Sequence, residues 1–281
     1  MLENQTAFIT GGARGIGLGI AKACLARGAK VAIADIDAAA LEAAAAELGS
    51  DAQIMTVQLD VTDREAFAAA ADDVEEQLGP VSLLFNNAGI MDSVTPVAMR
   101  GETWDFSVNV NLNGVYNGLQ AFVPRMIERK SGWIANTSSM AGLIPAGSGF
   151  SYHATKFAVV GLSRSLRFEL AHHNINVSVI CPGMVATSIV ENTKKLRPED
   201  AERHSTKISA ILSGAHERLL TVGESKEDAG ERIVSGLLEN RPYLFTDASD
   251  KDWRPLLEQQ HEELLSCLPS AEPALAAAQG A

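Results

Sequence analysis

Cysteine is scarce in this chain of 281 residues, which holds three such residues at wide spacings. An odd number without a Cys-x-x-Cys pair excludes a disulfide framework and a cysteine metal centre. We therefore expect Cys24, Cys181 and Cys267 to be reduced thiols that are mostly buried. The six histidines cluster with neither cysteine nor carboxylate residues, so we expect no metal site.

Long apolar segments are also missing from the sequence. No run of about 18 consecutive apolar residues occurs, which excludes a helix that spans a bilayer. The first residues show no basic segment followed by an apolar stretch. We therefore expect no secretory signal and a cytoplasmic protein.

Positive charge is in short supply as well. The chain has 23 lysine and arginine residues against 35 aspartate and glutamate residues, and its net charge is −12. No run of basic residues is longer than two. Such an acidic surface repels nucleic-acid phosphates and anionic lipid headgroups, so we predict neither a nucleic-acid nor a membrane partner.

The sequence instead alternates short apolar segments with longer amphipathic ones. The short segments are rich in β-branched residues, which is typical of buried strands, and cover 7–10, 31–35, 54–59, 81–86, 133–137, 177–181 and 243–246. Helix-like stretches lie at 15–27, 38–48, 64–78, 103–128 and 152–172. This repetition predicts an α/β fold, with a single doubly wound parallel sheet and helices on both faces.

Two regions depart from this alternation. Residues 188–228 are polar and charged without an obvious strand, and an insertion of that length predicts a lid over a binding site. Residues 251–281 form a C-terminal extension whose Ala- and Pro-rich end we expect to be disordered. The predicted organisation is one folded domain, 1–250, followed by that extension.

A glycine-rich turn, Gly11-x-x-x-Gly15-x-Gly17, follows the first predicted strand and opens the first predicted helix. Glycines permit a tight turn with positive φ and let the backbone approach a diphosphate without interference from a Cβ. The N–H groups and dipole at the helix start then hold the negative charge. The order of strand, glycines and helix predicts a dinucleotide site, and a plain strand-to-helix turn is the alternative.

Asp35 ends the second predicted strand, eighteen residues after Gly17. Its carboxylate can accept hydrogen bonds from the adenosine ribose hydroxyls. It also opposes a 2′-phosphate, because two unit charges about 4 Å apart cost about 4 kcal/mol at an effective dielectric of about 20. Asp37 adds to this field, whereas Arg14 is a cation that can bind such a phosphate. We weigh the repulsion more heavily and predict NAD rather than NADP as the cofactor.

Four further motifs follow the glycine turn in order: Asp60-Val61, Asn86-Asn87-Ala88-Gly89, a Tyr152-x-x-x-Lys156 pair preceded by Ser139, and Pro182-Gly183-Met184-Val185-Ala186-Thr187. With the glycine turn, they make the sequence resemble the short-chain dehydrogenase/reductases over residues 6–187. The resemblance implies a Rossmann-type fold, with 1–250 as the catalytic domain, and a nicotinamide-dependent oxidoreductase.

Chemistry accounts for the spacing of Tyr152 and Lys156. Residues four apart share one face of a helix. A phenol is a poor base near neutral pH, because its pKa is about 10. The Lys156 ammonium stabilises the phenolate and lowers that pKa, so that Tyr152 can exchange a proton with an alcohol or carbonyl oxygen. The alternative is an exposed tyrosine and lysine on a surface helix.

The resemblance implies roles for the other matched residues. Ser139 hydrogen-bonds the substrate oxygen, and Asn111 positions a water beside Lys156 in a proton relay. Ser138, next to Ser139, is interpreted as backbone support. The residues implied to contact the cofactor are Gly11, Arg14, Gly15, Ile16, Gly17, Asp35, Asp60, Val61, Asn87, Ala88, Gly89, Tyr152, Lys156, Pro182, Gly183, Val185 and Thr187.

The resulting hypothesis is reversible hydride transfer between NAD and a secondary alcohol or ketone, with oxidation as the favoured direction. The residues expected to line the substrate pocket are largely apolar, which favours an aromatic or alicyclic substrate; they are Met91, Asp92, Ser93, Leu143, Ile144, Pro145, Met184, Ile189 and Val190. An NADP-dependent carbonyl reductase, a non-catalytic NAD-binding regulator and a structural component of an oligomer are the alternatives.

A narrower resemblance concerns residues 110–115, residues 122–126 and the long C-terminal extension. These segments are similar to those of the Cα-dehydrogenases of lignin-derived aryl ethers. The wider family commonly forms dimers or tetramers through helices that flank the Tyr-Lys element. The resemblance therefore implies a homodimer or homotetramer through the helices at 111–128 and 152–172.

Overall fold

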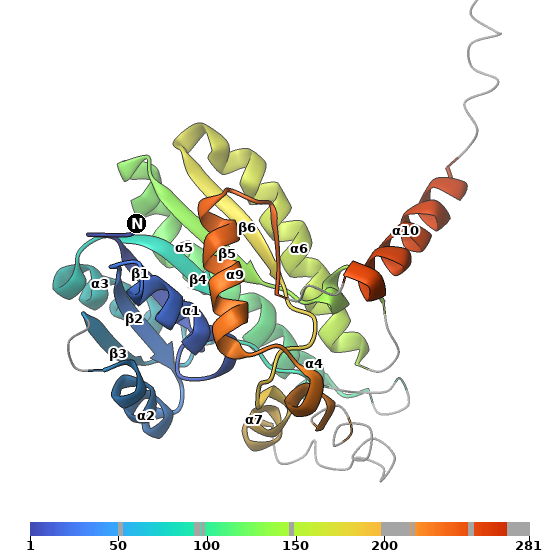
Figure 1. Ribbon diagram of the computed structural model, residues 1–281, viewed down its shortest axis with the longest axis horizontal. Coiled ribbons are helices and arrows are strands. Elements are labelled where there is room, and N and C mark those ends of the chain that lie inside the picture. The colour runs from blue at the N-terminus through green and yellow to red at the C-terminus, as the bar shows by residue number, and fades with distance from the viewer. Residues whose placement is uncertain are drawn as a thin grey trace, which may run out of the picture. The chain divides into compact units, whose positions relative to one another are not determined.

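The computed structural model describes residues 1–49, 53–92, 96, 99–145, 149–197, 214, 217–246 and 250–268 (Figure 1). Its strands are β1 (Thr6–Thr10), β2 (Lys30–Asp35), β3 (Ile54–Gln58), β4 (Val81–Asn86), β5 (Gly132–Thr137), β6 (Ile175–Cys181) and β7 (Tyr243–Phe245). Its helices include α1 (Gly15–Leu25), α2 (Ala38–Leu48), α3 (Arg64–Leu78), α4 (Gly101–Val108), α5 (Gly114–Arg129), α6 (Phe150–Leu170), α7 (Ile189–Leu196), α9 (Lys226–Leu238) and α10 (Asp250–Ser266).

The chain divides into two compact units, Met1–Asp247 and Ala248–Ala281. The second unit contains α10, on which Leu256, Leu264 and Leu265 are exposed. The C-terminal end that is predicted to be disordered lies outside the described residues, as does much of the predicted lid. None of the helices in the described ranges is long and apolar enough to cross a membrane.

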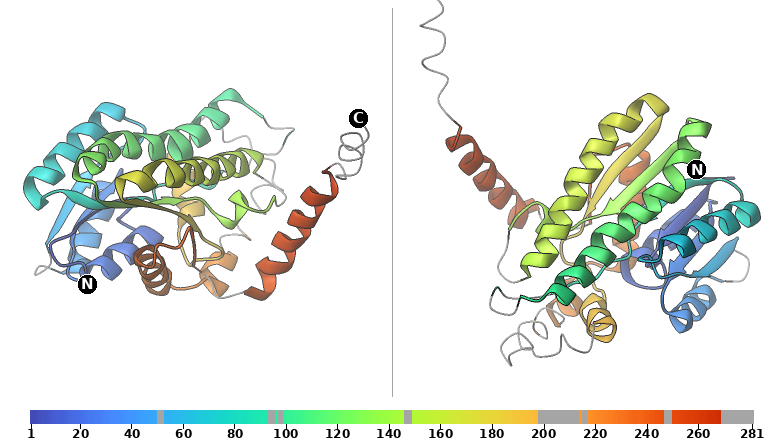
Figure 2. Two further views of the ribbon diagram at one scale, coloured as in Figure 1. Left: turned by 90° about the horizontal axis from the view of Figure 1, so that it is seen from above. Right: turned by 180° about the vertical axis from the view of Figure 1, so that it is seen from behind.

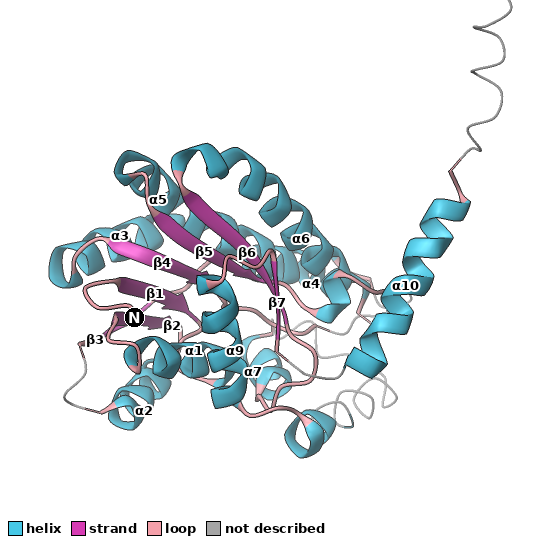
Figure 3. Ribbon diagram, turned by 45° about the horizontal axis from the view of Figure 1, so that its top comes forward, coloured by secondary structure: helices cyan, strands magenta, loops and turns pink. Residues whose placement is uncertain are grey.

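The seven strands form one parallel sheet in the order β3-β2-β1-β4-β5-β6-β7 (Figure 3). This order confirms the predicted doubly wound fold. The direction of winding changes between β1 and β4, and in open α/β sheets ligands bind at the carboxyl ends of the strands beside such a point. The glycine turn follows β1, and Asn87 follows β4, so the topology brings these two motifs together.

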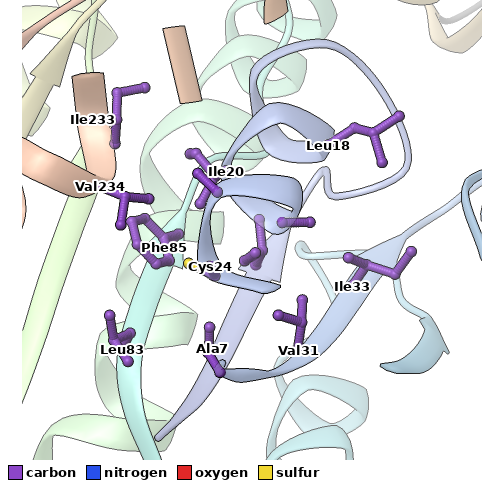
Figure 4. Close-up of a cluster of buried hydrophobic side chains, with 14 of the residues drawn as sticks. Ala7, Leu18, Ile20, Cys24, Val31, Ile33, Leu83, Phe85, Ile233 and Val234 are labelled. Atoms are coloured by element: carbon purple, nitrogen blue, oxygen red, sulfur yellow. The ribbon is translucent and has the colours of Figure 1, made fainter. Parts of the chain in front are cut away.

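Helices cover both faces of the sheet, with α1, α2 and α9 on one side and α3, α5 and α6 on the other (Figure 2). Successive side chains of a strand point to opposite faces, so β1 contributes to two cores. Ala7 and Ile9 belong to the core that includes residues of α1 and α9, and Figure 4 shows Ala7 in this cluster. Phe8 packs on the other face against Phe67 and Phe122, with ring centroids 5.8 and 5.0 Å away. Burial on both faces explains why the strands are almost continuously apolar.

The helix predicted over 103–128 is present, but it is not α-helical throughout. A π-helical turn, Asn109–Asn113, separates α4 from α5. Such turns are rare and frequently occur at functional sites. Asn111 lies at the centre of this turn and is fully buried. The stretch predicted as helix is therefore helical over its full length, but the sequence does not predict the π-helical turn at a candidate catalytic residue.

Candidate active site

The glycine turn after β1 requires glycine for two reasons. Gly11 and Gly15 have φ angles of 61° and 50°, in the left-handed region that favours glycine. The turn is also closely packed. A Cβ on Gly11 would lie 2.9 Å from the Cα of Ala88, and a Cβ on Gly15 would lie 2.9 Å from the Cγ2 of Thr187.

The start of α1, which follows this turn, has no side-chain cap and no acidic residue in its first turn. In contrast, Asp37 caps α2 and Asp63 caps α3. The uncapped N–H groups and the helix dipole of α1 suit a diphosphate. A cavity of about 660 Å³ opens here, and its lining includes Arg14, Gly15, Ala40, Ala44, Thr187 and Ser188.

The segment that follows β4 is bonded to the glycine turn through Thr10. The Thr10 Oγ1 accepts hydrogen bonds from the N–H groups of Asn87 and Ala88 at 2.9 and 3.0 Å. The Asn87 Nδ2 donates to the carbonyl oxygens of Thr10 and Gly11 at 3.0 and 3.3 Å. Thr10 has no role in the sequence prediction, and its place directly before the glycines was the available signal.

Asp35 lies at the end of β2, near the paired side chains of Arg14 and Asp37. Burial raises the pKa of Asp35, and hydrogen bonds from the N–H groups of Asp37 and Ala13 counteract part of this rise. The Arg14 Nη2 lies 2.6 Å from the Asp37 Oδ2, and this hydrogen bond lowers the pKa of Asp37. The cation that can bind a 2′-phosphate is therefore already paired with a carboxylate.

Tyr152 and Lys156 lie in the first two turns of α6, with Ser139 beside them. The Lys156 Nζ donates to the carbonyl oxygen of Thr137 at 3.0 Å and lies 5.5 Å from the centroid of the Tyr152 ring. The Ser139 side chain is hydrogen-bonded to Tyr152. The structure thus brings together three of the four residues predicted to be catalytic. The Thr137 carbonyl is a further partner that the sequence prediction does not contain.

The serine loop is anchored to α6 and to the end of β6. The Ser139 Oγ accepts the N–H of Ala141 at 3.1 Å and so caps the 3₁₀ turn Met140–Gly142. The neighbouring Ser138 Oγ donates to the carbonyl oxygen of Lys156 at 2.8 Å. The N–H of Met140 donates to the carbonyl oxygen of Pro182 at 2.9 Å. These bonds set the position of Ser139 relative to the Tyr-Lys helix.

Burial opposes the charged form of both Tyr152 and Lys156. It raises the pKa of Tyr152, and the hydrogen bond with Ser139 lowers that pKa in part. It also lowers the pKa of Lys156 to about 8. The sequence predicts that Lys156 lowers the pKa of Tyr152. The structure differs, because desolvation of the phenolate is the larger effect and the hydrogen bond with Ser139 opposes it only in part.

Asn111 completes the predicted set of four. Its Oδ1 accepts the N–H of Ile90 at 2.9 Å, and its Nδ2 donates to the carbonyl oxygen of Ile90 at 3.0 Å and to the Thr155 Oγ1 at 3.3 Å. Both amide hydrogens are used, and one lone pair of Oδ1 remains. A Cβ on Gly89 would lie 3.1 Å from the Asn111 Oδ1 and 3.3 Å from the Lys156 Nζ. The amide oxygen and the ammonium group therefore both lie next to Gly89.

The other predicted contacts lie around the same edge of the sheet. Asp60 is exposed and accepts the N–H and hydroxyl of Thr62 at 2.9 and 2.8 Å. Val185 is buried and pairs in parallel with Glu224, just before α9. The predicted pocket residue Ser93 lies outside the described residues. Among the residues that are described, no group of three or more histidine, cysteine or acidic side chains can hold a metal ion.

Comparison with known proteins assigns the family. The model of the short chain dehydrogenase family matches residues 5–198. The chain belongs to this family. The C alpha-dehydrogenase of Sphingobium sp. is 36% identical to this short-chain dehydrogenase over 250 residues, which cover 86% of the chain and 80% of the relative. The 3beta-hydroxysteroid dehydrogenase 2 of Eggerthella lenta is 37% identical over 218 residues, covering 76% of the chain and 82% of the relative.

A solved structure extends this likeness over nearly the whole chain. The short chain dehydrogenase/reductase of Burkholderia phymatum in complex with NAD matches with a TM-score of 0.87 at 28% identity, covering 97% of this chain and 98% of that one. These comparisons confirm the predicted family of oxidoreductases and the narrower likeness to the Cα-dehydrogenases.

Proposed function

We propose that this short-chain dehydrogenase is an NAD-dependent enzyme that interconverts a secondary alcohol and a ketone. The observation that carries the proposal is the convergence of Tyr152, Ser139 and Lys156 beside the glycine turn. An alcohol loses one proton and one hydride when it becomes a ketone. Tyr152 takes the hydroxyl proton, and Ser139 hydrogen-bonds the same oxygen as its charge develops. The dinucleotide, when bound, supplies the acceptor for the hydride.

Lys156 and Asn111 support the proton transfer in this proposal. Burial raises the pKa of Tyr152, so its phenolate needs a nearby cation to form. The Lys156 ammonium is that cation, 5.5 Å from the centre of the ring. The Asn111 Oδ1 keeps one free lone pair, and it lies next to Gly89, as does the Lys156 Nζ. This arrangement suits a path for the proton away from Tyr152.

The residues around the glycine turn fit a dinucleotide, and we assign the cofactor as NAD. The open start of α1 would hold the diphosphate, and Asp35 would accept hydrogen bonds from the adenosine ribose hydroxyls. Arg14 is the feature that favours the second candidate, an NADP-dependent carbonyl reductase. Its pairing with Asp37 argues against that candidate. A 2′-phosphate would have to displace the Asp37 carboxylate from Arg14 and would still lie beside the Asp35 carboxylate.

The substrate that we propose is an apolar aromatic or alicyclic alcohol, and oxidation is the proposed direction. The segments expected to line the substrate pocket are largely apolar, among them Met91, Leu143, Ile144, Ile189 and Val190, and Met91 and Ile189 pack against Val190. Such a lining recognises a hydrocarbon skeleton better than a sugar. Two relatives are named as a C alpha-dehydrogenase and a 3beta-hydroxysteroid dehydrogenase, which agrees with this choice.

We also propose that copies of this chain associate as a homodimer or homotetramer through α5 and α6. These helices run alongside each other on the outside of one face (Figure 2). Aromatic side chains are exposed on both of them: Tyr116 on α5, and Phe157 and Phe168 on α6. Helices with exposed aromatic residues are typical of a surface that is covered in an assembly.

The replacement Tyr152→Phe tests the catalytic assignment. We expect kcat for alcohol oxidation to fall about 100- to 10,000-fold, because the proton acceptor is removed. The Kd for NADH, measured by fluorescence titration, should change little. Secondary alcohols are screened with NAD and with NADP by the absorbance of the reduced cofactor, and kcat/KM should be higher with NAD.

Tyr116→Phe is the matched control, because this tyrosine is exposed on α5. It should keep the turnover of the wild-type protein. Full activity of Tyr152→Phe would contradict the assignment, and a higher kcat/KM with NADP would favour the carbonyl reductase. Tight NADH binding without turnover of any alcohol would instead support a non-catalytic regulator.

A further inference from the structure

Three consecutive residues after β4, Ile90, Met91 and Asp92, lie between Asn111 and α7; we call them the 90–92 segment. On one side of this segment, Asn111 binds both backbone groups of Ile90, at 2.9 and 3.0 Å. Ile90 and Asn111 are both buried, so water cannot replace these bonds. A displacement of the 90–92 segment therefore displaces the Asn111 amide as well.

On its other side, the 90–92 segment contacts α7. The N–H of Met91 donates to the Thr193 Oγ1 at 2.9 Å, and the Thr193 hydroxyl in turn donates to the carbonyl oxygen of Ile189 at 2.7 Å. Val190 is 1% exposed, and Met91 and Ile189 pack against it. The helix thus rests on the segment through a backbone hydrogen bond and an apolar contact.

A buried ion pair completes this contact. The Asp92 carboxylate is paired with the Arg197 guanidinium at the end of α7, and their side chains are 0% and 5% exposed. Removal of two charges from water is unfavourable, so such a pair adds little net stability. Loss of one partner, however, leaves the other charge buried without the attraction of the pair. The pair therefore adds little to docking while both charges are present, but removal of one charge disfavours the docked arrangement of α7.

A second ion pair on the same helix shows the contrast. The Lys194 Nζ lies 3.0 Å from the Glu191 Oε1, and the two side chains are 38% and 43% exposed. Solvent screens an exposed pair of this kind, and its effect on stability is small. It provides a reference for the effect of an exposed charge on α7.

We propose that Asp92 and Arg197 are positioning residues, which dock α7 on the 90–92 segment and, through Ile90, hold the Asn111 amide in place. This inference rests on the proposed function, because it gives Asn111 a part in the proton path. Docked α7 also holds Val190 against Met91, which buries both the helix and the segment in one apolar contact. The position of the Asn111 amide then depends on the docking of α7.

The test compares three variants with a matched control. Asp92→Asn removes one charge with little change of shape, Arg197→Gln removes the other, and the double variant removes both. Glu191→Gln is the control, because it neutralises an exposed carboxylate on α7 and keeps the tryptic sites at Lys194 and Lys195. The rate of trypsin cleavage at these two lysines measures docking without any substrate. The values of kcat, KM and the Kd for NADH are measured on the same samples.

We expect trypsin to cleave Asp92→Asn about 10-fold faster than the wild-type protein, because cleavage follows the population of undocked α7. Its kcat/KM should fall about 10- to 100-fold, with a lower kcat because the Asn111 amide shifts, and with an unchanged Kd for NADH. The double variant should recover part of both losses, since neither charge of the pair is then buried. The control Glu191→Gln should match the wild-type protein.

The proposal is overturned if Asp92→Asn shows the cleavage rate and the kcat/KM of the wild-type protein. Faster cleavage with an unchanged kcat/KM also overturns it, because α7 would then dock without positioning the site. A wild-type protein that oxidises no alcohol refutes the proposed function, and the positioning role falls with it. The cleavage rates distinguish these failures, because they report docking independently of turnover.

Discussion

At the scale of single residues, the buried lysine of the site has a consequence for stability. The Lys156 side chain is 3% exposed, and burial lowers its pKa from 10.5 to about 8. Between these two values the unfolded chain binds the proton and the folded chain releases it. Stability rises with pH wherever the unfolded state binds more protons. Lys156 therefore destabilises the fold at neutral pH, and this effect disappears as the pH rises from about 8 to 10.5.

The replacement Lys156→Met tests this effect. A shift of this size corresponds to about 3 kcal/mol. We therefore expect the stability of the variant, relative to the wild-type protein, to decline by up to about 3 kcal/mol between pH 7 and pH 10.5. Denaturant unfolding of both proteins at several pH values measures the difference. Lys194→Met, at an exposed lysine, is the control and should show no such trend. A pH-independent difference for Lys156→Met would contradict the proposed desolvation.

The residue types of the site could be predicted from the sequence, but their partners could not. Tyr152, Lys156 and Ser139 have a spacing with chemical meaning, and the structure places them together. The carbonyl oxygen of Thr137 and the backbone of Ile90 are partners that any residue type can provide. No sequence signal marks them, because a carbonyl acquires its partner from the topology of the sheet and from the π-helical turn.

At the scale of elements, the position of α9 depends on its crossing with α1, where both helices have a glycine. Gly19 of α1 faces Gly230 of α9. A Cβ on Gly19 would lie 1.8 Å from the carbonyl oxygen of Lys226, and a Cβ on Gly230 would lie 2.2 Å from the carbonyl carbon of Gly19. Only glycines allow the two helices to approach so closely. On the same two helices, Ile20 of α1 and Ile233 of α9 belong to one buried core (Figure 4).

The replacement Gly230→Ala tests this crossing. The added methyl group forces the helices apart, so we expect the free energy of unfolding to fall by about 1–3 kcal/mol. Gly101→Ala is the control, because a Cβ at this exposed position in α4 meets no atom within 4 Å. Thermal or denaturant unfolding measures both variants. Equal stability of Gly230→Ala and the wild-type protein would show that the helices can separate without loss.

The start of α9 is a feature that the sequence analysis does not predict. The charged stretch before residue 228 led to the prediction of a polar lid, whereas α9 begins at Lys226. Ser225 caps this helix by accepting the N–H of Asp228 at 3.0 Å, and Ile233 and Val234 are buried. The capping residue and the apolar positions of α9 can both be recognised in the sequence. Strongly periodic segments such as 38–48 and 64–78 were predicted at their observed bounds, because each has an aspartate cap and a clear end.

At the scale of the whole molecule, the proposed assembly must overcome repulsion between acidic copies. The net charge of −12 disfavours association, so the contact has to come from apolar surface. On α6, Phe157, Gly161 and Phe168 have spacings of four and seven residues and share one face. The aromatic side chains are 38% and 76% exposed, and a Cβ on Gly161 would meet no atom within 4 Å. An exposed glycine in the middle of a helix is unfavourable, unless another helix packs closely against it.

The double replacement of Phe157 and Phe168 by glutamate tests this interface. We expect the wild-type protein to sediment as a dimer or tetramer at micromolar concentration, and the variant to sediment as a smaller species with unchanged circular dichroism. Val222→Glu, at a residue that is 60% exposed outside α5 and α6, should leave the sedimentation of the protein unchanged. A monomeric wild-type protein would contradict the proposal. Because α6 carries Lys156 next to Phe157, loss of the partner helix should also lower kcat, since the helix that positions the catalytic pair would lose its outer support.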